Sequence, residues 1–252
     1  MFTEHFTIYH SHCDRNGYLK TDLFQEMILN TACSAAEAGG FGIPTLNRLG
    51  LTWVMARFQM HVNQHPRIGD KLKIETWIEQ NRMGFSIRNF RVSADSCLLS
   101  VDSCPDELKT ENCELKTVIA EARSAWAVID VKSRESVNFN ELQHIPVPEG
   151  NPVDLPTMPR PDRKAATIST EHTVRFTDLD QNGHCNSSRY LGIMLDAYGS
   201  IDGLLPRDLL VSYSHETFFG ETLKVSRTQT EDPFFAIHNP QGELCVSAHF
   251  VL

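Results

Sequence analysis

Gly69-Asp70-Lys71-Leu72-Lys73-Ile74 returns in the second half of the chain as Gly220-Glu221-Thr222-Leu223-Lys224-Val225. A second pair of short stretches, Asp14-Arg15-Asn16-Gly17 and Asp180-Gln181-Asn182-Gly183, repeats in the same order. Self-similarity in a fixed order indicates a duplicated structural unit. We therefore expect two copies of one unit within the 252 residues.

The first copy contains one predicted helix followed by strands. Apolar residues at helical spacing predict the helix from Phe24 to Ala35, with Asp22 and Gln25 resembling a capping box before it and Gly39-Gly40 ending it. The clearest strand is Asp70 to Glu79, where side chains alternate with a period of two. Residues 94–117 interrupt a hairpin as an acidic, cysteine-bearing insertion.

The second copy follows a proline-rich linker and repeats the same order of elements. A short strand, His172 to Phe176, precedes a helix with Leu191 and Met194 on one face, and Asn186 or Ser187 is its expected N-cap. Further strands are expected at 209–216, 221–230 and 243–251. Each copy is then an α+β unit in which a sheet of about five strands folds over a central helix. The predicted division is 1–146, a linker at 147–164, and 165–252.

Composition excludes several classes of protein. The net charge of −9 argues against general nucleic-acid binding, which needs clustered lysine and arginine. No apolar run approaches the ~18 residues that span a membrane, and Met1 to His5 has neither part of a secretory signal. Seven cysteines is an odd number, so reduced thiols in a cytoplasm are expected.

The two copies differ in one informative way. The first has Asn16-Gly17-Tyr18, whereas the second has Asn182-Gly183-His184-Cys185-Asn186. Only the second gains a histidine, so we expect one catalytic copy and one scaffold copy. Asp180, Asn182 and His184 precede a helix, where unpaired N–H groups stabilise a developing oxyanion. Glu216 supplies a carboxylate, so the set suits water-driven acyl transfer.

Plainer interpretations compete with this one. Asp-x-Asn-Gly is a common turn sequence, and a lone histidine is more often a surface or capping residue than a base. The chain has no G-x-S-x-G, and Gly40-Phe41-Gly42 lacks the third glycine of a dinucleotide site. Cys97, Cys104 and Cys113 have spacing that makes a zinc site a weak hypothesis, so no metal is expected. His61 and His65 are interpreted as surface histidines.

The whole string Arg175-Phe176-Thr177-Asp178-Leu179-Asp180-Gln181-Asn182-Gly183-His184-Cys185-Asn186 resembles the D-x-N-x-H-x-N loop of the acyl-acyl-carrier-protein thioesterase family of bacteria and plant plastids. Ser124 to Asp130 and the Glu216 strand support the resemblance, which covers the chain apart from residues 94–117. One departure is Thr217, where the family often has cysteine. The chain resembles a bacterial, cytoplasmic member.

The resemblance implies a tandem hot-dog fold, no cofactor, and catalysis by Asp180, Asn182, His184 and Glu216. The expected activity is hydrolysis of fatty acyl-acyl carrier protein, which releases free fatty acid and ends chain elongation. The acyl chain, linked through phosphopantetheine, is expected to lie against the first helix. The substrate-binding residues predicted on that helix are Phe24, Met27, Ile28, Thr31 and Ala35. The protein is expected as a monomer or a homodimer.

Several alternatives stay open at this point. The same fold suits an acyl-CoA thioesterase or a non-catalytic acyl sensor, and either His184 or Glu216 could be the general base. Cys185 beside His184 invites a cysteine nucleophile, but adjacent residues on an extended loop tend to point apart. Carrier docking requires a local basic patch on an acidic protein. The candidates are Arg57, Arg67, Lys71, Lys73, Arg82, Arg88 and Arg91, set against Asp70, Glu75 and Glu79.

Overall fold

The computed structural model describes residues 1–252 except 83, 96–115, 140–141, 143–146, 159–165 and 200–204. The elements in chain order are β1 Phe2–Thr7, η1 His10–His12, α1 Thr21–Ala38, α2 Ile43–Arg48, β2 Leu51–Val62, β3 Lys71–Arg82, β4 Phe85–Asp95, β5 Lys116–Asp130, β6 Ile168–Thr173, η6 Phe176–Asp178, α3 Arg189–Tyr198, β7 Asp208–Tyr213, β8 Thr222–Arg227, β9 Phe234–His238 and β10 Leu244–Val251. No helix among these residues is long and apolar enough to cross a membrane.

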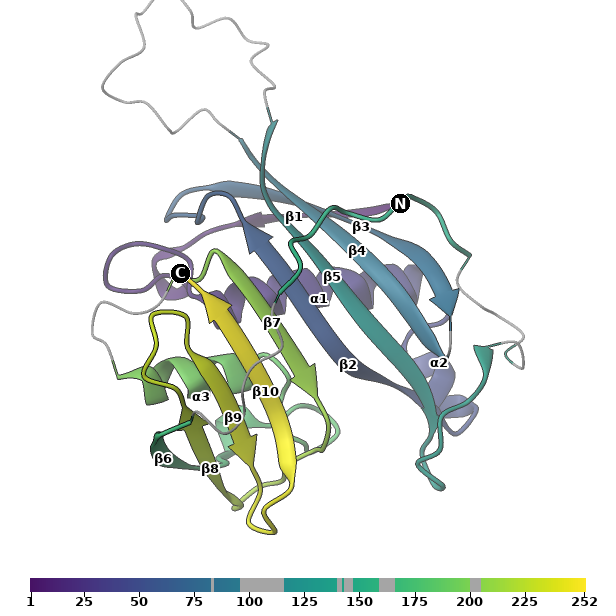
Figure 1. Cartoon of the computed structure of the whole chain (residues 1–252). Helices are drawn as coiled ribbons and strands as arrows, with labels where there is room; N and C mark the ends of the chain where they lie inside the picture. Colours follow the sequence, from purple (N-terminus) through teal and green to yellow (C-terminus); the bar gives the residue numbers. More distant parts are fainter. Residues whose placement is uncertain (83, 96–115, 140–141, 143–146, 159–165, 200–204) are drawn as a thin grey trace, which may run out of the picture.

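The strands form one ten-stranded sheet whose order is symmetric about its centre. That order is β1-β3-β4-β5-β2-β7-β10-β9-β8-β6, so the second five strands repeat the first five in reverse (Figure 1). The halves join through antiparallel pairing of β2 with β7, in which Arg57 lies opposite Ser212. Each half carries one long helix, α1 or α3, on the same face of the sheet (Figure 1). The predicted α+β double hot-dog fold is confirmed.

The repeated Asp-x-Asn-Gly stretches adopt one backbone structure. Oδ1 of Asp14 accepts the N–H groups of Asn16 and Tyr18, each at 2.9 Å. Oδ1 of Asp180 accepts the N–H groups of the two equivalent residues, at 2.8 and 3.1 Å. The glycine in each loop has a positive φ, +81° and +79°, which side-chain-bearing residues rarely adopt. The duplication seen in the sequence is therefore a duplication of the turn itself.

The two helices approach each other closely near their N-terminal ends. A Cβ at Gly192 of α3 would lie 3.1 Å from Oδ2 of Asp22 in α1, so glycine permits this approach. Helix α1 begins at Thr21 and its N-cap, Lys20, makes no side-chain capping bond. The expected capping box at Asp22 is therefore wrong, because that carboxylate instead lies 3.8 Å from Arg189. Packing between the helices outweighs the local capping preference here.

The described part of the linker, 147–158, has neither helix nor strand and lies across the outer face of the sheet (Figure 1). Nε1 of Trp77 donates to the carbonyl of Asn151 at 2.8 Å. A guanidinium N–H of Arg123 donates to the carbonyl of Val153 at 2.6 Å, and Val153 is buried. The linker is thus packed onto β3 and β5 rather than hanging free.

Several element boundaries differ from the expected ones. Strand β7 ends at Tyr213, so Glu216 lies in the turn before β8 and not in a strand. The N-cap of α3 is Ser188, although Oδ1 of Asn186 accepts its N–H and hydroxyl at 3.1 Å. Helix α2 and strand β9 were not expected. The 94–117 insertion falls mainly on 96–115, outside the described residues.

Candidate active site

The loop from Leu179 to Cys185 is held against the turn that follows β7. Leu179 bridges to Cys185 across the loop, and His184 bridges to Phe218 in the turn. The N–H of Cys185 donates to the carbonyl of Thr217 at 2.9 Å. These backbone bonds place the residues on either side of Thr217 beside His184.

His184, Glu216 and Arg134 meet at this junction. Nδ1 of His184 lies 3.3 Å from Oε1 of Glu216, and a guanidinium N–H of Arg134 donates to Oε2 of Glu216 at 2.5 Å. The imidazole packs edge-on against Phe218, with ring centroids 5.2 Å apart. Arg134 comes from the first half of the chain, in the turn after β5. Its φ of +63° is the one positive φ among the described residues other than glycine. Both halves therefore contribute to the site.

Asp180 and Asn182 occupy different positions from those of the pair. The Asp180 carboxylate accepts backbone N–H groups of the loop, including that of His184, so it shapes the loop that carries the imidazole. Asn182 lies at the exposed tip, and its side chain makes no recorded contact with Glu216. The structure thus brings two of the four predicted catalytic side chains together, and the roles of all four stay predictions.

The backbone of the loop is already engaged, which corrects one expectation. The N–H groups of Asn182 and His184 bind the Asp180 carboxylate, and the N–H of Gly183 binds the Asp180 carbonyl at 3.1 Å. The N–H of Cys185 is also used. These four amides do not form a free oxyanion hole, because Asp180 accepts three of them and the carbonyl of Thr217 accepts the fourth. Helix α3 begins only at Arg189, several residues further on.

The thiol beside His184 faces the core. Cys185 is 5% exposed, and burial, reinforced by the negative charge of Asp178, raises its pKa to about 12. Thr217 is fully buried, and its hydroxyl shares a 2.8 Å hydrogen bond with that of Tyr190. Position 185, which has a thiol, and position 217, where the family often has one, are thus both buried.

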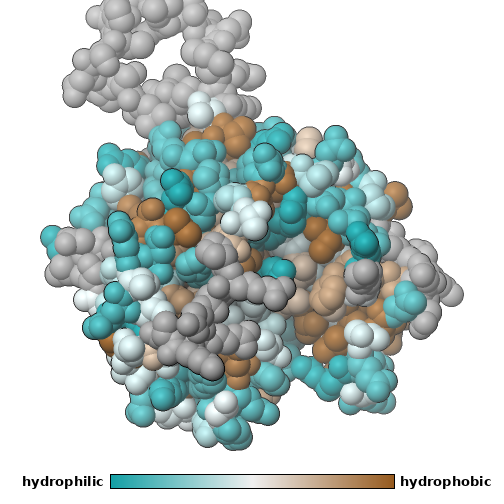
Figure 2. All heavy atoms as spheres, in the orientation of Figure 1, coloured by the Kyte–Doolittle hydropathy of each residue, from teal (hydrophilic) through white to brown (hydrophobic). Residues whose placement is uncertain are grey.

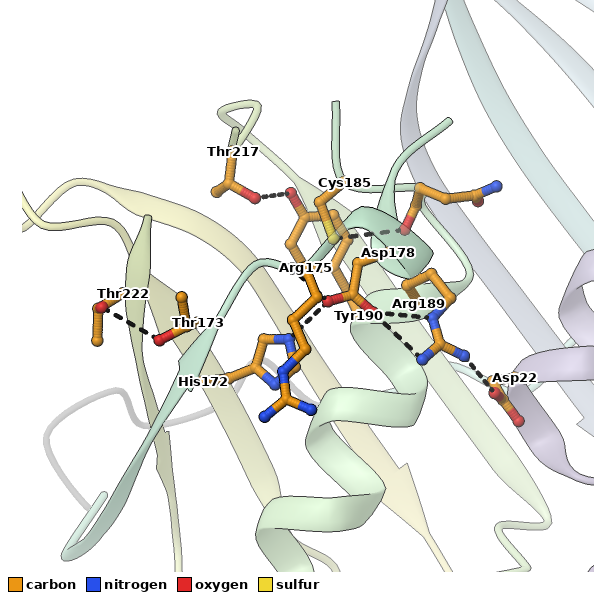
Figure 3. A network of polar contacts seen from close by, with 11 residues as sticks. Asp22, His172, Thr173, Arg175, Asp178, Cys185, Arg189, Tyr190, Thr217 and Thr222 are labelled. Carbon is orange, nitrogen blue, oxygen red and sulfur yellow. Dashed lines mark hydrogen bonds and ion pairs between the residues drawn. The ribbon is translucent and has the colours of Figure 1, made fainter. Parts of the chain in front are cut away.

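A buried carboxylate fixes the start of the loop (Figure 3). Asp178 is 2% exposed and accepts from the N–H of Arg175 at 2.9 Å, while His172 and Arg189 approach it at 2.9 and 3.2 Å. Burial acts to raise the pKa of Asp178, but these hydrogen bonds and the charge of His172 outweigh it, and the pKa lies below 3.8. Arg189 also lies 3.8 Å from Asp22 of α1, so this network connects the candidate loop to the first half.

A pocket lies in the first half, beside the C-terminal part of α1. It encloses a cavity of about 50 Å³. Its lining residues are Ala32, Cys33, Ala36, Glu37, Phe41, Ile43, Trp53, Ser86, Arg88 and Trp126. The five residues predicted to bind substrate, Phe24, Met27, Ile28, Thr31 and Ala35, are all buried, but none of them lines this cavity. The pocket uses the predicted helix but a different face of it.

The pocket and the His184–Glu216 pair are related through the sheet. Glu216 accepts a hydrogen bond from Arg134, whose backbone N–H donates to the carbonyl of Asp130. Asp130 pairs with Leu51, at the end of β2 that also carries Trp53. Trp53 lines the pocket. In the view of Figure 2, hydrophobic atoms gather over the end of the sheet beside α2, whereas the rest of this face is mostly hydrophilic.

The proposed docking patch loses one member. Arg88 is only 6% exposed and projects from β4 into the pocket, so it is not a surface residue. Arg91 is exposed on the other face of β4, but it pairs with Glu121 at 3.0 Å. Arg82 is exposed as expected. One of the histidines interpreted as surface residues, His61, is half-buried and lies 2.5 Å from Asp208.

Sequence reasoning did not predict the positions of two arginines, Arg134 beside Glu216 and Arg88 in the wall of the pocket. Arg134 lies in a loop of the scaffold half, and nothing in its local sequence indicates that its guanidinium reaches Glu216. Arg88 follows an alternation that could have been noticed, because Ser86, Arg88, Phe90 and Val92 share one face of a strand. Among the described residues, no group of three potential metal ligands is present.

A ten-stranded sheet formed by two repeated halves, each with a helix on the same face, defines the class of double hot-dog proteins. Models of the acyl-ACP thioesterase N-terminal and C-terminal domains match residues 1–104 and 162–249. The chain therefore belongs to the acyl-ACP thioesterase family.

Similar proteins agree with this assignment. An acyl-ACP thioesterase structure from Bacteroides thetaiotaomicron is 25% identical with a TM-score of 0.78, covering 99% of this chain and 96% of that one. The 12:0-ACP thioesterase from Umbellularia californica has a TM-score of 0.79 at 16% identity, over 99% of this chain and 96% of that one, and it supports the fold. The chloroplastic acyl-[acyl-carrier-protein] hydrolase FATB2 of Cuphea viscosissima is 25% identical over 213 residues, or 78% of this chain and 47% of the relative. The chain spans about half the length of the curated relatives it matches.

Proposed function

We propose that this protein hydrolyses the thioester of fatty acyl-acyl carrier protein and releases free fatty acid. The observation that carries the proposal is the contact of His184 with Glu216 at 3.3 Å, beside a pocket in the partner half. The family and the names of its relatives, which include acyl-[acyl-carrier-protein] hydrolases and a 12:0-ACP thioesterase, support the substrate class. In this proposal residues 1–146 bind the acyl chain, 147–164 link the halves, and 165–252 carry the catalytic loop.

The arrangement favours His184 as the general base. Both carboxylate oxygens of Glu216 are engaged, one by Arg134 and one by Nδ1 of His184. A carboxylate at Nδ1 orients an imidazole and leaves Nε2 to take a proton from water. Among the described residues, none is recorded as a hydrogen-bond partner of Nε2. Water activated there attacks the thioester carbonyl, and His184 then returns the proton to the departing thiolate.

The oxyanion requires donors other than the loop backbone. Asn182 carries a side-chain amide at the exposed tip of the same loop, so it is our candidate donor to the thioester carbonyl oxygen. Asp180 acts indirectly, because it holds the N–H groups on both sides of Gly183. This assigns each of the four predicted residues a separate role.

The test is the hydrolysis of purified acyl-acyl carrier protein by His184→Ala, Asp180→Ala and Glu216→Gln. His184→Ala should lower turnover by at least ~10²-fold, as loss of a positioned acid–base group usually does. Asp180→Ala and Glu216→Gln should lower it by a similar factor, because Asp180 shapes the loop that carries His184 and Glu216 orients its imidazole. Added imidazole should restore part of the activity of His184→Ala only. The matched control is His215→Ala, because His215 is an exposed neighbour whose Nδ1 lies 2.9 Å from the carbonyl oxygen of Leu244, not beside Glu216. Near-normal turnover of His184→Ala would reject the assignment.

Acyl-CoA is the alternative substrate, and a non-catalytic acyl sensor is the alternative from another class. Release of thiol from acyl-acyl carrier protein and from acyl-CoA, measured side by side, separates all three. Release from neither, with acyl binding retained, would identify a sensor. The described cysteines Cys13, Cys33, Cys185 and Cys245 are free, and we propose a reducing compartment, the cytoplasm, as the location.

Carrier docking is the least constrained part of the proposal. Arg82 and Arg91 stay our candidates for contact with the acidic carrier. Their replacement by glutamate should raise the KM for acyl-acyl carrier protein, more at low salt, and leave the KM for acyl-CoA unchanged. A KM that does not move at low salt would remove this surface from the docking site. The protein is proposed to act as a monomer or a homodimer, because each chain already contains both halves.

A further inference from the structure

Arg88 is an unusual residue for the wall of an acyl pocket. Its side chain is 6% exposed, and Nη1 donates to the hydroxyl of Thr76 at 3.2 Å. In the part of the chain that the structure describes, no carboxylate lies within 4.0 Å of its guanidinium. Burial lowers the pKa of Arg88 to about 10, with the negative charge of Glu149 acting in the opposite direction from beyond ion-pair distance, so Arg88 stays charged at neutral pH. A charge buried without an ion-pair partner is costly unless something else solvates it.

The wall around Arg88 is polar as well. Ser86 lies one inward position before it on β4, and Ser124 lies opposite it on β5. Both serines are buried, and Ser124 accepts the indole N–H of Trp126 at 2.7 Å. A pocket meant only for methylene groups gains nothing from hydroxyls and a guanidinium in its wall, since burying alkyl surface is favourable against apolar neighbours.

The position of Arg88 lies far from the reacting thioester. Trp53 on β2 pairs with Val128 of β5, and Arg88 on β4 pairs with Ser124 of the same strand. The two residues are thus two strands apart and four residues along, which is about 16 Å at ordinary strand spacing and rise. Glu216 binds Arg134 in the turn that follows Asp130, beyond Val128 along β5, so a group that meets Arg88 belongs to the distal part of the acyl chain. The cavity of about 50 Å³ has room for roughly four water-sized groups.

We propose that Arg88 is a specificity-determining residue that selects acyl chains carrying an oxygen atom, as a hydroxyl or a carboxylate, on their distal part. A guanidinium has five N–H groups, and among the described residues the hydrogen bond to Thr76 uses one of them, so the others can donate to a bound oxygen. Glu37 also lines the pocket, and its carboxylate favours a hydroxyl, which can donate to it, over a second carboxylate. The proposal rests on the proposed hydrolysis and narrows its substrate class.

The first experiment compares kcat/KM of the wild-type protein for three series of acyl-acyl carrier proteins: alkanoyl, ω-hydroxyalkanoyl and ω-carboxyalkanoyl. A hydrogen bond to a charged group predicts a preference for an oxygenated chain of about 10- to 100-fold at the best chain length. Comparison of the ω-hydroxyalkanoyl and ω-carboxyalkanoyl series shows whether the pocket prefers a hydroxyl or a carboxylate. A preference for the unsubstituted chain at every length would overturn the proposal.

The second experiment assigns the preference to Arg88. Arg88→Met should abolish the preference for oxygenated chains, measured as the ratio of the kcat/KM values, and Arg88→Lys should keep part of that preference. The control is Arg91→Met, which removes an exposed arginine from the other face of β4 and should leave the preference intact. A preference that survives in Arg88→Met would refute the role of this residue. If that variant does not fold, the wild-type comparison still decides.

A binding measurement separates this proposal from the proposed hydrolysis. Trp53 and Trp126, two of the three tryptophans, line the pocket, so their fluorescence should change when a free acid binds. Tighter binding of ω-hydroxyalkanoate than of alkanoate, without cleavage of any thioester, would support the pocket and reject the hydrolysis. Cleavage of thioesters with equal binding of the two acids would support the hydrolysis and reject the role of the pocket in selecting oxygenated chains.

Discussion

The thiol of Cys185 provides the sharpest test of the chemistry, because it adjoins the proposed base. With a pKa of about 12, its thiolate fraction at pH 7 follows directly. That fraction is about 10⁻⁵, compared with about 3% for a cysteine with an ordinary pKa of about 8.5. A thiol suppressed as a nucleophile by about three orders of magnitude, and 5% exposed, is not poised to attack a substrate. We therefore expect Cys185→Ser to keep most of its activity.

The assay pairs hydrolysis of acyl-acyl carrier protein with alkylation by iodoacetamide. Because Cys33 is exposed and lines the pocket, alkylation there would block the acyl chain and imitate loss of a nucleophile. The experiment therefore uses Cys33→Ser as its background and locates the label by mass spectrometry. Slow labelling of Cys185 with full activity is the expected outcome. Rapid inactivation that acyl substrate prevents, with the label on Cys185 and with Glu216→Gln still active, would refute the reasoning.

Three further outcomes can be checked. Arg134→Met should lower kcat by about 10-fold without a change in thermal stability, because it removes a partner of Glu216 from an exposed turn. Asp178→Asn should destabilise the protein at pH 7, because a carboxylate with a lowered pKa stabilises the fold only while it is ionised. The difference in unfolding free energy between wild type and variant, measured by denaturant unfolding, should therefore shrink as the pH falls below 3.8. A difference that persists in acid would contradict this. Isolated residues 165–252 should be insoluble or inactive, since β7 would expose the edge that pairs with β2, and an active monomeric fragment would argue against the shared sheet.

The sequence predicted the duplicated architecture because its signals are local. Turn residues with fixed backbone demands, such as Asp14 and Gly17, or Asp180 and Gly183, repeat wherever the same turn repeats. Element boundaries were less accurate where packing decides them. Glu216 was assigned to a strand because Leu209 to Tyr213 reads continuously into it, but β7 ends when pairing with β2 and β10 ends.

The site was predictable only in its local part. His184 was visible as the difference between two otherwise equal loops. Arg134 was not, since its partner Glu216 is 82 positions away and only the pairing of the two halves brings them together. The face of α1 that lines the pocket could not be predicted either. Hydrophobic spacing marks the face that packs most tightly, which includes Phe24 and Ile28. A cavity lies where packing is incomplete, and here that is a different face of the helix.

The fusion of the two halves also changes how the protein can evolve. In a homodimer of hot-dog units one gene encodes both copies of the loop, so every substitution appears at two sites at once. In the fused chain the codons for Tyr18 and His184 vary independently. One loop can then drift under selection for folding alone while the other is constrained by chemistry. The same hydrogen bonds hold both loops although one carries Tyr18 and the other His184, so the turn accepts either residue at this position.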